Sequence, residues 1–533
     1  MYVAILAGLL SVSIGRADEP TNDDSPPAGI QPTTASLSQV LKAHELAVGT
    51  SAKVSPPVRT ESWTFTKDGQ QGAERIVRRG TDYHATITSG PFAEEYGQLG
   101  DARWYVNQNG AVTASDRTDI SAFDMFRVLE DASDPKNDVK LLGTVASPSP
   151  AYVVEVTRPG FKHREWVFID TKTSLITQTQ RRIGKFLIVS TYDGYQTTQG
   201  LTEPTHIHDS EATGGLEDDY KRESITFSSS ADPSEFTKPQ PRETFMQVSQ
   251  PSSIDGRVTR GTVIVRLTIA GRGLDFELSS GDGQSYIDSD VARELGLPAF
   301  GHATASNGSP LPYETRIDEA MAGDVELKNF ALEVIPFHYH ADADTKIVGT
   351  LGYDFLSCGL FIVDYVNHRV SVAPNTDAPP EPDMYFLPVT FDDGRPFFTS
   401  TIGSHETNNV LLDSSFLYSV IFGSFTGAYP EAVVDMSNGK QHTHTIVPFA
   451  DGGTYGRDID IWIASVPDIH IGPTHYINYR ILATNWGFEG ERPVDAVMGT
   501  QFLAFYDVYY DFAHSRVYLK PNDFFHRSFK PHT

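Results

Sequence analysis

The chain has 533 residues, more than one ordinary domain holds, so two to four domains are expected. A hydrophobic content of 39% is ordinary for globular protein and excludes wholesale disorder. The net charge of −27 argues against nucleic-acid and anionic-membrane partners, and a single cysteine excludes an intramolecular disulfide and CxxC metal sites.

The N-terminal end has the pattern of an export signal. An apolar run from Val3 to Ile14 is followed by a small-residue stretch and then by polar residues. The run is too short to span a bilayer, which takes roughly 20 residues. Residues 1–17 are therefore predicted to be a signal peptide and residues 18–34 a flexible leader, in a periplasmic or secreted protein without an integral membrane segment.

Residues 35–230 are predicted to form a curved antiparallel sheet preceded by a short helix. The helix is expected over 35–48 from its amphipathic pattern. Its apolar positions on or near one face are Leu37, Val40, Leu41 and Leu46. Short alternating stretches joined by turn residues follow, which is typical of successive hairpins.

Two stretches near the end of this region, "FIDTKTSLITQTQ" and "YDGYQTTQGLTEPTHI", carry a likeness to a known family. They resemble the half-barrel of periplasmic lipoprotein carriers. The resemblance implies a concave apolar face that could hold a lipid or another hydrophobic ligand. The alternative is a domain that packs against its neighbour and positions it.

A linker is predicted over 231–249, and the rest of the chain contains two segments that repeat each other. They are 250–373 and 384–523, separated by a Pro-rich linker over 374–383. In both copies a Gly, Gly352 or Gly499, is followed after three residues by Phe-Leu, after 12 by Asp and after 17 by Arg-Val. Both copies also contain an Asn-Gly hairpin signal, Asn307-Gly308 and Asn438-Gly439.

Each copy opens with a strand that runs into a tight turn. The turns are "FELSSGDGQSYI" and "VLLDSSFLYSVI", and they align with Ser279 opposite Asp413. Both then have Ser six residues later, at Ser285 and Ser419, and Ile eight residues later.

This arrangement resembles the retropepsin-like and pepsin-like aspartic peptidases, whose two lobes each carry an Asp-Thr/Ser-Gly turn, a flap hairpin and a later apolar-apolar-Gly motif. The resemblance implies a mainly β, bilobal double-β domain behind the N-terminal half-barrel. It makes Asp413 the catalytic acid of the second lobe, with Ser279 in place of the first. The substrate-binding residues that it implies are Ser280, Gly281, Ser414, Asn307, Gly308, Asn438 and Gly439.

The chemistry of that family needs two carboxylates close enough to share one proton. Ser279 can donate a hydrogen bond to Asp413, but its hydroxyl is too weakly acidic to replace a carboxyl. Asp282 could serve as the missing acid only if it broke the spacing to Ser285 and to the helix that follows, so Ser279 is preferred as the aligned position. Ser415 replaces the Gly of the second turn, which puts that turn's geometry in doubt.

Three functions remain open. The preferred one is an impaired peptidase that binds extended peptide or protein segments between its lobes by strand addition. The second is an active aspartic-type peptidase that uses Asp413, and the third is a carrier with a lipid or hydrophobic ligand in the N-terminal half-barrel.

No cofactor or metal is expected. Three His-x-His pairs, at 206 and 208, 338 and 340, and 442 and 444, could each offer two imidazoles on one face of a strand. A structural site needs about four ligands, so surface histidines are the preferred interpretation.

Overall fold

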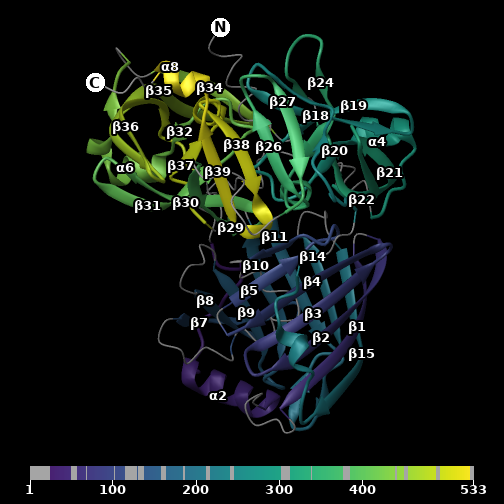
Figure 1. Ribbon diagram of the computed structural model, residues 1–533. Helices are drawn as coiled ribbons and strands as arrows, with labels where there is room; N and C mark the ends of the chain where they lie inside the picture. Colours follow the sequence, from purple (N-terminus) through teal and green to yellow (C-terminus); the bar gives the residue numbers. More distant parts are fainter. Residues whose placement is uncertain are drawn as a thin grey trace.

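The computed structural model has an N-terminal sheet domain and a C-terminal domain with two β-barrel lobes side by side (Figure 1). The structure describes residues 25–49, 57–67, 69–100, 102–114, 129, 137–157, 164–183, 186–211, 217–240, 245–301, 312–337, 339–375, 384–437, 441–448, 454–487 and 492–528. The mainly β fold class is confirmed.

The predicted signal peptide and residues 18–24 of the predicted leader lie outside the described residues, so they stay predictions. The end of the leader is attached to the sheet domain. Gln31 exchanges two backbone hydrogen bonds with Thr144, each 2.8 Å long, and Ile30 packs against the neighbouring apolar cluster.

The N-terminal domain is one thirteen-stranded sheet in which every neighbouring pair is antiparallel. Its strands in spatial order are β6 (Val112–Ala114), β5 (Ala102–Val106), β4 (Phe92–Leu99), β3 (Asp82–Ser89), β2 (Gln70–Arg79), β1 (Val58–Lys67), β15 (Glu217–Ser228), β14 (His206–Glu211), β11 (Phe186–Asp193), β10 (Ile176–Ile183), β9 (Glu165–Asp170), β8 (Ala151–Thr157) and β7 (Asp138–Val145). A small hairpin, β12 (Gln196–Thr198) and β13 (Leu201–Glu203), is separate from it.

Helix α2 (Leu37–Val48) begins at a capping box. The Ser36 side chain accepts a hydrogen bond from the backbone of Gln39, and the Gln39 side chain accepts one from the backbone of Ser36. Val40 is buried, but Leu46 is 74% exposed, so its predicted place on the apolar face is wrong. Leu46 lies two residues after a buried position, and at 100° per residue this turns it away from the sheet.

The sheet face that α2 covers is apolar in one part and ionic in another. The apolar part includes Trp63, and Leu37 and Leu41 of the helix pack against it. Arg59 and Glu61 lie on the same face of β1 as Trp63, because side chains two residues apart share a face. They join a buried ionic cluster with Glu203 of β13 and Arg222 of β15.

The cluster is held by short ion pairs. Arg59 Nη1 lies 2.6 Å from Glu203 Oε1, Arg59 Nη2 lies 2.6 Å from Glu61 Oε1, and Arg222 Nη1 lies 3.1 Å from Glu203 Oε2. All four residues are less than 9% exposed. Buried charges of this kind are tolerated only when they are paired.

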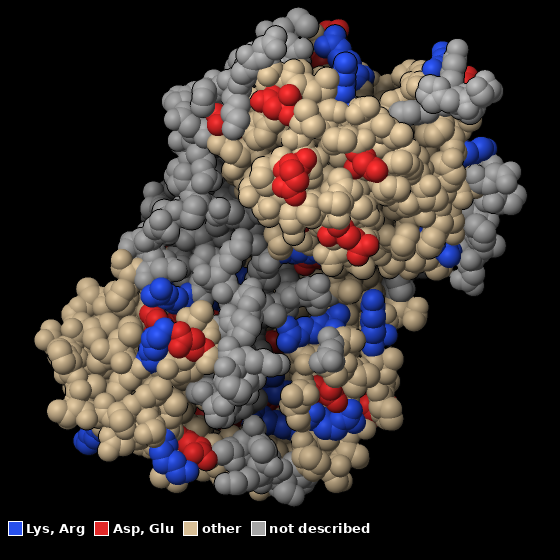
Figure 2. Space-filling model, turned by 90° about the vertical axis from the view of Figure 1, so that its left-hand side faces the viewer, with Lys and Arg blue, Asp and Glu red and all other residues tan. Residues whose placement is uncertain are grey.

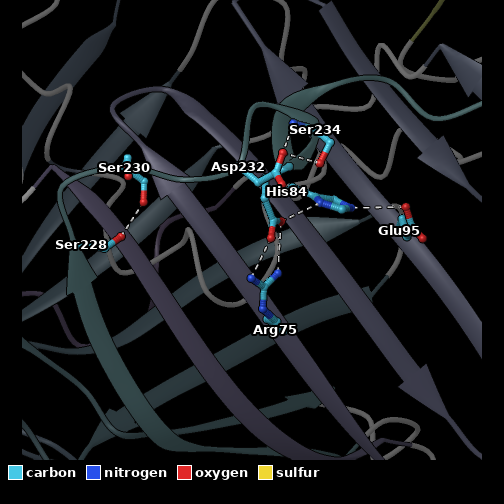
Figure 3. A network of polar contacts seen from close by, with 8 residues as sticks. Arg75, His84, Glu95, Ser228, Ser230, Asp232 and Ser234 are labelled. Atoms are coloured by element: carbon cyan, nitrogen blue, oxygen red, sulfur yellow. Dashed lines mark hydrogen bonds and ion pairs between the residues drawn. The ribbon is translucent and has the colours of Figure 1, made fainter.

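The other face of the sheet carries the start of the predicted linker (Figure 3). A 3-10 helix, η2 (Pro233–Phe236), places Glu235 between Arg75 and His84, and His84 also contacts Glu95. Arg75, and to a lesser degree His84, hold the pKa of Glu235 below its usual range against the effect of partial burial. The linker is thus fixed to the sheet at this point.

The first lobe is a seven-stranded sheet that closes into a barrel through a pairing of β18 with β21. Its strands in order are β17 (Gly256–Thr259), β18 (Thr262–Ile269), β19 (Arg272–Leu278), β25 (Gly349–Leu351), β20 (Tyr286–Asp288), β22 (Val325–Ile335) and β21 (Tyr313–Ala322). Helices α4 (Ser289–Leu295) and α5 (Tyr353–Leu356) and the two-stranded β23 (Tyr339–His340) and β24 (Lys346–Ile347) complete it.

The second lobe closes in the same way, through a pairing of β30 with β35. Its strands in order are β29 (Thr390–Asp392), β30 (Arg395–Ile402), β31 (His405–Leu412), β37 (Ala496–Met498), β32 (Val420–Ile421), β36 (Thr474–Thr484), β35 (Thr454–Ile471) and β33 (Val434–Asp435), with β34 (Gln441–Pro448) beside β35. Its helical elements are α6 (Gly423–Ala428), η3 (Pro430–Ala432) and α7 (Thr500–Leu503).

Both lobes use the same unusual pairings. The strand that leads into the turn runs parallel to the short strand that ends just before Gly352 or Gly499. These pairs are β19 with β25 and β31 with β37. The strand after the turn pairs parallel with the hairpin strand, as β20 does with β22 and β32 with β36. The offsets that the two segments share in sequence thus correspond to shared positions in the fold.

A six-stranded sheet joins the lobes, and each half of the C-terminal domain supplies strands to it (Figure 1). The order is β16 (Ser252–Ser253), β27 (Arg369–Ala373), β26 (Leu360–Asp364), β38 (Tyr506–Asp511), β39 (Arg516–Pro521) and β28 (Tyr385–Pro388). The 3-10 helix η4 (Phe512–His514) lies between β38 and β39, and α8 (Asp523–Ser528) follows. The linker predicted between the lobes lies mostly outside the described residues.

Charged side chains are unevenly spread over one face of the molecule (Figure 2). Acidic side chains stand in separate groups on the upper, C-terminal part, while basic and acidic side chains lie next to one another in the lower part. Within the described ranges, no helix has the length and apolarity that crossing a bilayer requires.

Candidate functional site

The two aligned turns meet where the lobes touch. Ser279 follows β19 and Asp413 follows β31, and both are 0% exposed. The backbone N–H of Ser279 donates to Leu351 at 3.0 Å, and that of Asp413 donates to Met498 at 3.1 Å. Leu351 ends β25 and Met498 ends β37, which are equivalent strands of the two lobes. Ser279 and Asp413 therefore occupy equivalent positions.

The serines that follow tie the two turns together. The Ser280 N–H donates to the Ser414 hydroxyl at 3.0 Å, and the Ser414 N–H donates to the Ser280 hydroxyl at 2.9 Å. Each hydroxyl then donates across the lobe boundary, to Leu412 and Leu278 respectively. Their hydroxyls are used within the domain in this way, so substrate binding by Ser280 and Ser414 stays a prediction.

Three donors converge on Oδ1 of Asp413. They are the Ser279 hydroxyl at 3.4 Å, the Ser415 N–H at 2.8 Å and the Ser415 hydroxyl at 2.6 Å. Such donors stabilise the ionised form of a carboxyl group. Ser415, which replaces the Gly of the family's turn, therefore contributes two of the three hydrogen bonds to Asp413.

Asp282 belongs to the same buried group, although the sequence spacing disfavours it as the acid. It is 7% exposed, and its Oδ2 is buried without a hydrogen-bond partner. Burial, and next the negative charge of Asp413, raise its pKa well above the usual range, while hydrogen bonding from Ser279 opposes the rise. Ser279 thus acts on two carboxyl groups, one from each lobe.

Glu277 adds a third buried carboxyl that sequence reasoning misses. It is 0% exposed, and neither of its side-chain oxygens has a hydrogen-bond partner. Its pKa is raised well above the usual range by burial and then by the charges of Asp282 and Asp413. The available signal is a Glu within an otherwise apolar part of β19.

The serine six residues after each aligned position has the same task in both lobes. Ser285 Oγ accepts a hydrogen bond from the Gly352 N–H at 3.0 Å, and Ser419 Oγ accepts one from the Gly499 N–H at 3.3 Å. These bonds join each turn to the helix that follows the apolar-apolar-Gly motif.

Both predicted flap tips lie outside the described residues. This applies to Asn307 and Gly308 in the first lobe and to Asn438 and Gly439 in the second, so their contact with substrate stays a prediction.

Gly281 is required by the packing of the turns. A Cβ at this position would lie 2.1 Å from Asp413 Oδ2 and 2.2 Å from its Cγ. Gly281→Ala is expected to displace Asp413 and to destabilise the C-terminal domain by about 1–3 kcal/mol, the usual cost of overpacking. Urea unfolding of the variant measures the change.

Gly427→Ala is the control for this substitution, because a Cβ there meets nothing within 4 Å. It should unfold at the same urea concentration as the parent protein, or slightly higher. Equal stability of Gly281→Ala and the parent would contradict the packing argument.

Among the residues that the structure describes, one group of possible metal ligands lies at the end of the β35–β36 hairpin. Asp468, His470 and His475 have ligand atoms within 4.8 Å of one another. The two imidazoles stack with an interplanar angle of 4°, so their lone pairs do not converge on one point as a tetrahedral ion requires. In this arrangement the three form an ion-pair cluster and could hold a metal only after the rings turn.

Of the histidine pairs found in the sequence, His206 and His208 both contact Asp219. His206 is paired with Asp193 as well, and this pairing raises its pKa. His338 and the side chains of His442 and His444 lie outside what the structure describes.

Comparison with known proteins gives the following likenesses. Residues 265–355 match the family model described as aspartyl protease. An aspartic proteinase from Irpex lacteus is 10% identical, with a TM-score of 0.31, over 51% of this chain and 98% of that chain. No curated protein matches the sequence.

Structures similar to the N-terminal part include a putative outer membrane lipoprotein-sorting protein domain from Vibrio parahaemolyticus. It is 10% identical, with a TM-score of 0.28, over 38% of this chain and 95% of that chain. A LolA superfamily protein from Nitrosomonas europaea is 13% identical, with a TM-score of 0.29, over 38% of this chain and 98% of that chain.

The family match covers the first turn with Ser279 and the strand that ends before Gly352, and two barrel lobes meet at that turn. The chain therefore contains an aspartic-protease-like domain.

Proposed function

We propose that the C-terminal domain is an aspartic-type hydrolase of peptide or protein segments, with Asp413 as the base and Asp282 as the acid. One observation carries the proposal: the Ser279 hydroxyl donates to Asp413, and both Ser279 and Asp413 act on the pKa of the buried Asp282 where the two lobes meet. The first lobe then has its acid three residues later than the family pattern places it.

The environments of the two carboxyls suit opposite roles. Asp413 receives three hydrogen bonds on one oxygen, which favours its ionised form as a base. The pKa of Asp282 is raised by burial and by the charge of Asp413, which favours its protonated form as an acid. A pair with unequal proton affinities is what acid-base hydrolysis of an amide needs.

The proton steps balance within this pair. Asp413 takes a proton from a water molecule that attacks the substrate carbonyl carbon, while Asp282 gives its proton to the carbonyl oxygen. When the tetrahedral intermediate collapses, Asp282 recovers a proton from a hydroxyl of that intermediate and Asp413 gives its proton to the leaving nitrogen. The carbon–nitrogen bond breaks, and both carboxyls return to their first states.

Ser279 has a positioning role in this scheme. Its hydroxyl donates to Asp413 and opposes the rise in the pKa of Asp282, so it acts on both carboxyl groups. Activity should fall as the pH rises through the raised pKa of Asp282, because the acid then loses its proton.

The test is digestion of a peptide library between pH 3 and pH 7, followed by mass spectrometry. Asp413→Asn and Asp282→Asn should each reduce cleavage by about 10²- to 10⁴-fold, the usual worth of acid-base assistance. The control Asp290→Asn, an exposed acid in α4 that pairs with Arg293, should cleave as the parent does.

Two outcomes would overturn the proposal. If Asp282→Asn retained full activity while Asp413→Asn lost it, another group would be the acid. If the parent bound peptides without cleaving any of them, the domain would be an impaired peptidase that acts as a peptide-binding module.

We further propose that the chain works outside the cytoplasm, which rests on the signal-like residues 1–17. A ligand role for the N-terminal sheet stays a separate prediction. The ionic cluster around Glu203 occupies part of the face that would hold a hydrophobic ligand, and α2 covers its apolar part. Lipid that co-purifies with the protein, identified by mass spectrometry, would support the carrier hypothesis.

A further inference from the structure

The turn between β5 and β6 of the N-terminal domain is inserted into the first lobe. Ala111 of this turn belongs to the same buried apolar cluster as the core of the two lobes. Asn107 shapes the turn, because its side-chain oxygen accepts hydrogen bonds from the N–H groups of Asn109 and Ala111, each 3.0 Å long. The turn is therefore rigid on its own side of the interface.

Asn109 uses its whole side-chain amide on the first lobe. Its nitrogen donates to Asp354 Oδ2 at 2.6 Å and to the Ala331 carbonyl at 2.9 Å, and its oxygen accepts from the Ala331 N–H at 2.9 Å. Asn109 and Asp354 are 3% and 1% exposed. A carboxyl buried this deeply depends on each of its hydrogen-bond partners.

Asp354 in turn holds the turn that carries Ser279 and Asp282. Its Oδ1 accepts from the Ser285 hydroxyl at 2.5 Å, and its Oδ2 accepts from the Ser285 N–H at 3.3 Å. Ser285 ends the segment that begins at Ser279, so a chain of hydrogen bonds runs from the N-terminal domain to the end of the catalytic turn.

A second connection runs through Tyr353. Its hydroxyl donates to the Val112 carbonyl in β6 at 2.9 Å, and its backbone N–H donates to the Asp282 carbonyl at 2.8 Å. The ring of Tyr353 packs against Phe391 and Phe512, with centroids 4.7 and 5.9 Å apart. Asp282 is thus linked to the same N-terminal hairpin.

The second lobe offers an internal comparison. Gln501 occupies the position of Asp354, two residues after Gly499, and its side-chain oxygen accepts from the Ser419 N–H at 3.3 Å. Its amide nitrogen donates to the Arg480 carbonyl at 3.2 Å within the same lobe. The second lobe therefore completes this support with its own residues, whereas the first lobe takes its partner from the N-terminal domain.

We propose that Asn109 is a positioning residue for the catalytic turn of the first lobe, and that the β5–β6 turn makes the N-terminal domain part of the catalytic unit. The geometry of this support does not depend on hydrolysis, but its effect on turnover rests on the function proposed above. Removing the amide of Asn109 frees Ser285 and Asp282 to move without touching either carboxyl.

The test compares hydrogen exchange in the intact protein and in Asn109→Ala. Exchange of the amides in 279–285 should become at least about tenfold faster, while exchange in 413–419 should stay unchanged. The matched control is Gln108→Ala, which removes the neighbouring side chain of the same turn and its bond to Glu314 in β21 but leaves the bond between Asn109 and Asp354 in place. This control should leave 279–285 protected.

Two further variants separate positioning from a general loss of structure. Asp354→Asn keeps an acceptor for Ser285 but places an amide opposite Asn109, so it should also speed exchange in 279–285. The double variant Asn109→Asp/Asp354→Asn swaps the two side chains. It should restore part of the protection of 279–285, because an amide again faces a carboxylate.

The effect of Asn109→Ala on peptide cleavage is measured in a separate experiment. If the parent cleaves peptides, Asn109→Ala should lower kcat by about 10- to 100-fold with KM nearly unchanged, since small displacements of a catalytic group have effects of this size. If the parent cleaves nothing, the proposed function fails and the exchange result still decides the role of Asn109. Unchanged exchange in 279–285 in both Asn109→Ala and Asp354→Asn would overturn the inference.

Discussion

Replacing Glu277 with Gln is expected to stabilise the C-terminal domain at pH 7 and to leave its stability nearly unchanged near pH 4. Glu277 is buried without a hydrogen-bond partner for either carboxyl oxygen, and burial raises its pKa well above the usual range. The folded protein must therefore keep this group protonated, while the unfolded chain releases the proton at ordinary pH.

The sign follows from proton linkage. Between the unfolded pKa of about 4.3 and the raised folded pKa, the native state binds more protons than the unfolded state, so stability falls as the pH rises. The slope for one such group approaches about 1.4 kcal/mol per pH unit. Gln has nearly the same shape as Glu and does not ionise, so the stability of the variant lacks this contribution to the fall with rising pH.

Urea unfolding at several pH values between 4 and 7.5 measures the difference between the variant and the parent. The control is Glu319→Gln, an exposed Glu on β21 of the same lobe, which should follow the parent at every pH. A constant difference between Glu277→Gln and the parent over this range would contradict the assignment of Glu277 as a buried, protonated carboxyl.

The second large effect is expected in the N-terminal domain, where Glu203→Ala should cost about 3–5 kcal/mol of stability. The substitution removes the partner that Arg59 and Arg222 share, at 2.6 and 3.1 Å, and leaves both guanidinium groups buried. The cost of an uncompensated buried charge dominates, whereas the net worth of the intact pair is much smaller.

Native-state hydrogen exchange in β1 and β15, the strands that carry Arg59 and Arg222, gives the stability of this domain separately from that of the lobes. Glu45→Ala in α2 is the control, because Glu45 forms an exposed ion pair with Lys42 and its loss should cost at most about 1 kcal/mol. Similar exchange in Glu203→Ala and in this control would show that the ionic cluster is not structurally important.

Much of the fold could be predicted from the sequence because the same offsets occur twice. Ser285 follows Ser279 at the same offset as Ser419 follows Asp413. Each serine accepts the same hydrogen bond, from the N–H of Gly352 or Gly499. A strand and turn with the same internal offsets, and a later glycine motif with the same offsets after it, restrict the chain so strongly that the pattern predicts the place of each residue in the fold. The place of Asp413 at the meeting of the lobes follows from the same pattern.

The role proposed for Asp282 could not be predicted in this way. Which carboxyl a turn brings near Asp413 depends on backbone dihedrals that residue spacing does not contain. The alignment by spacing also assigns only one position of each turn to the acid. In the structure, Asp282 interacts with Ser279 and Asp413 although it lies three residues after the aligned position.

The contacts of Asn109 and Glu203 could not be predicted from the sequence for another reason. Each interacts with residues far away in the chain, Asn109 with Asp354 and Glu203 with Arg59. The partners share no local pattern, so only the three-dimensional arrangement brings them together. An Asn in a hairpin turn and a Glu at a strand end look like ordinary surface residues in the sequence.

The six-stranded sheet that joins the lobes also determines when the domain can be completed during synthesis. Strand β26 has β27 on one side, and its other neighbour is β38, residues 506–511. A nascent chain that has formed the first lobe therefore exposes the edge of β26 until the last part of the second segment has left the ribosome. An exposed strand edge is a template for pairing with other chains, so this interval is when the protein is most open to aggregation.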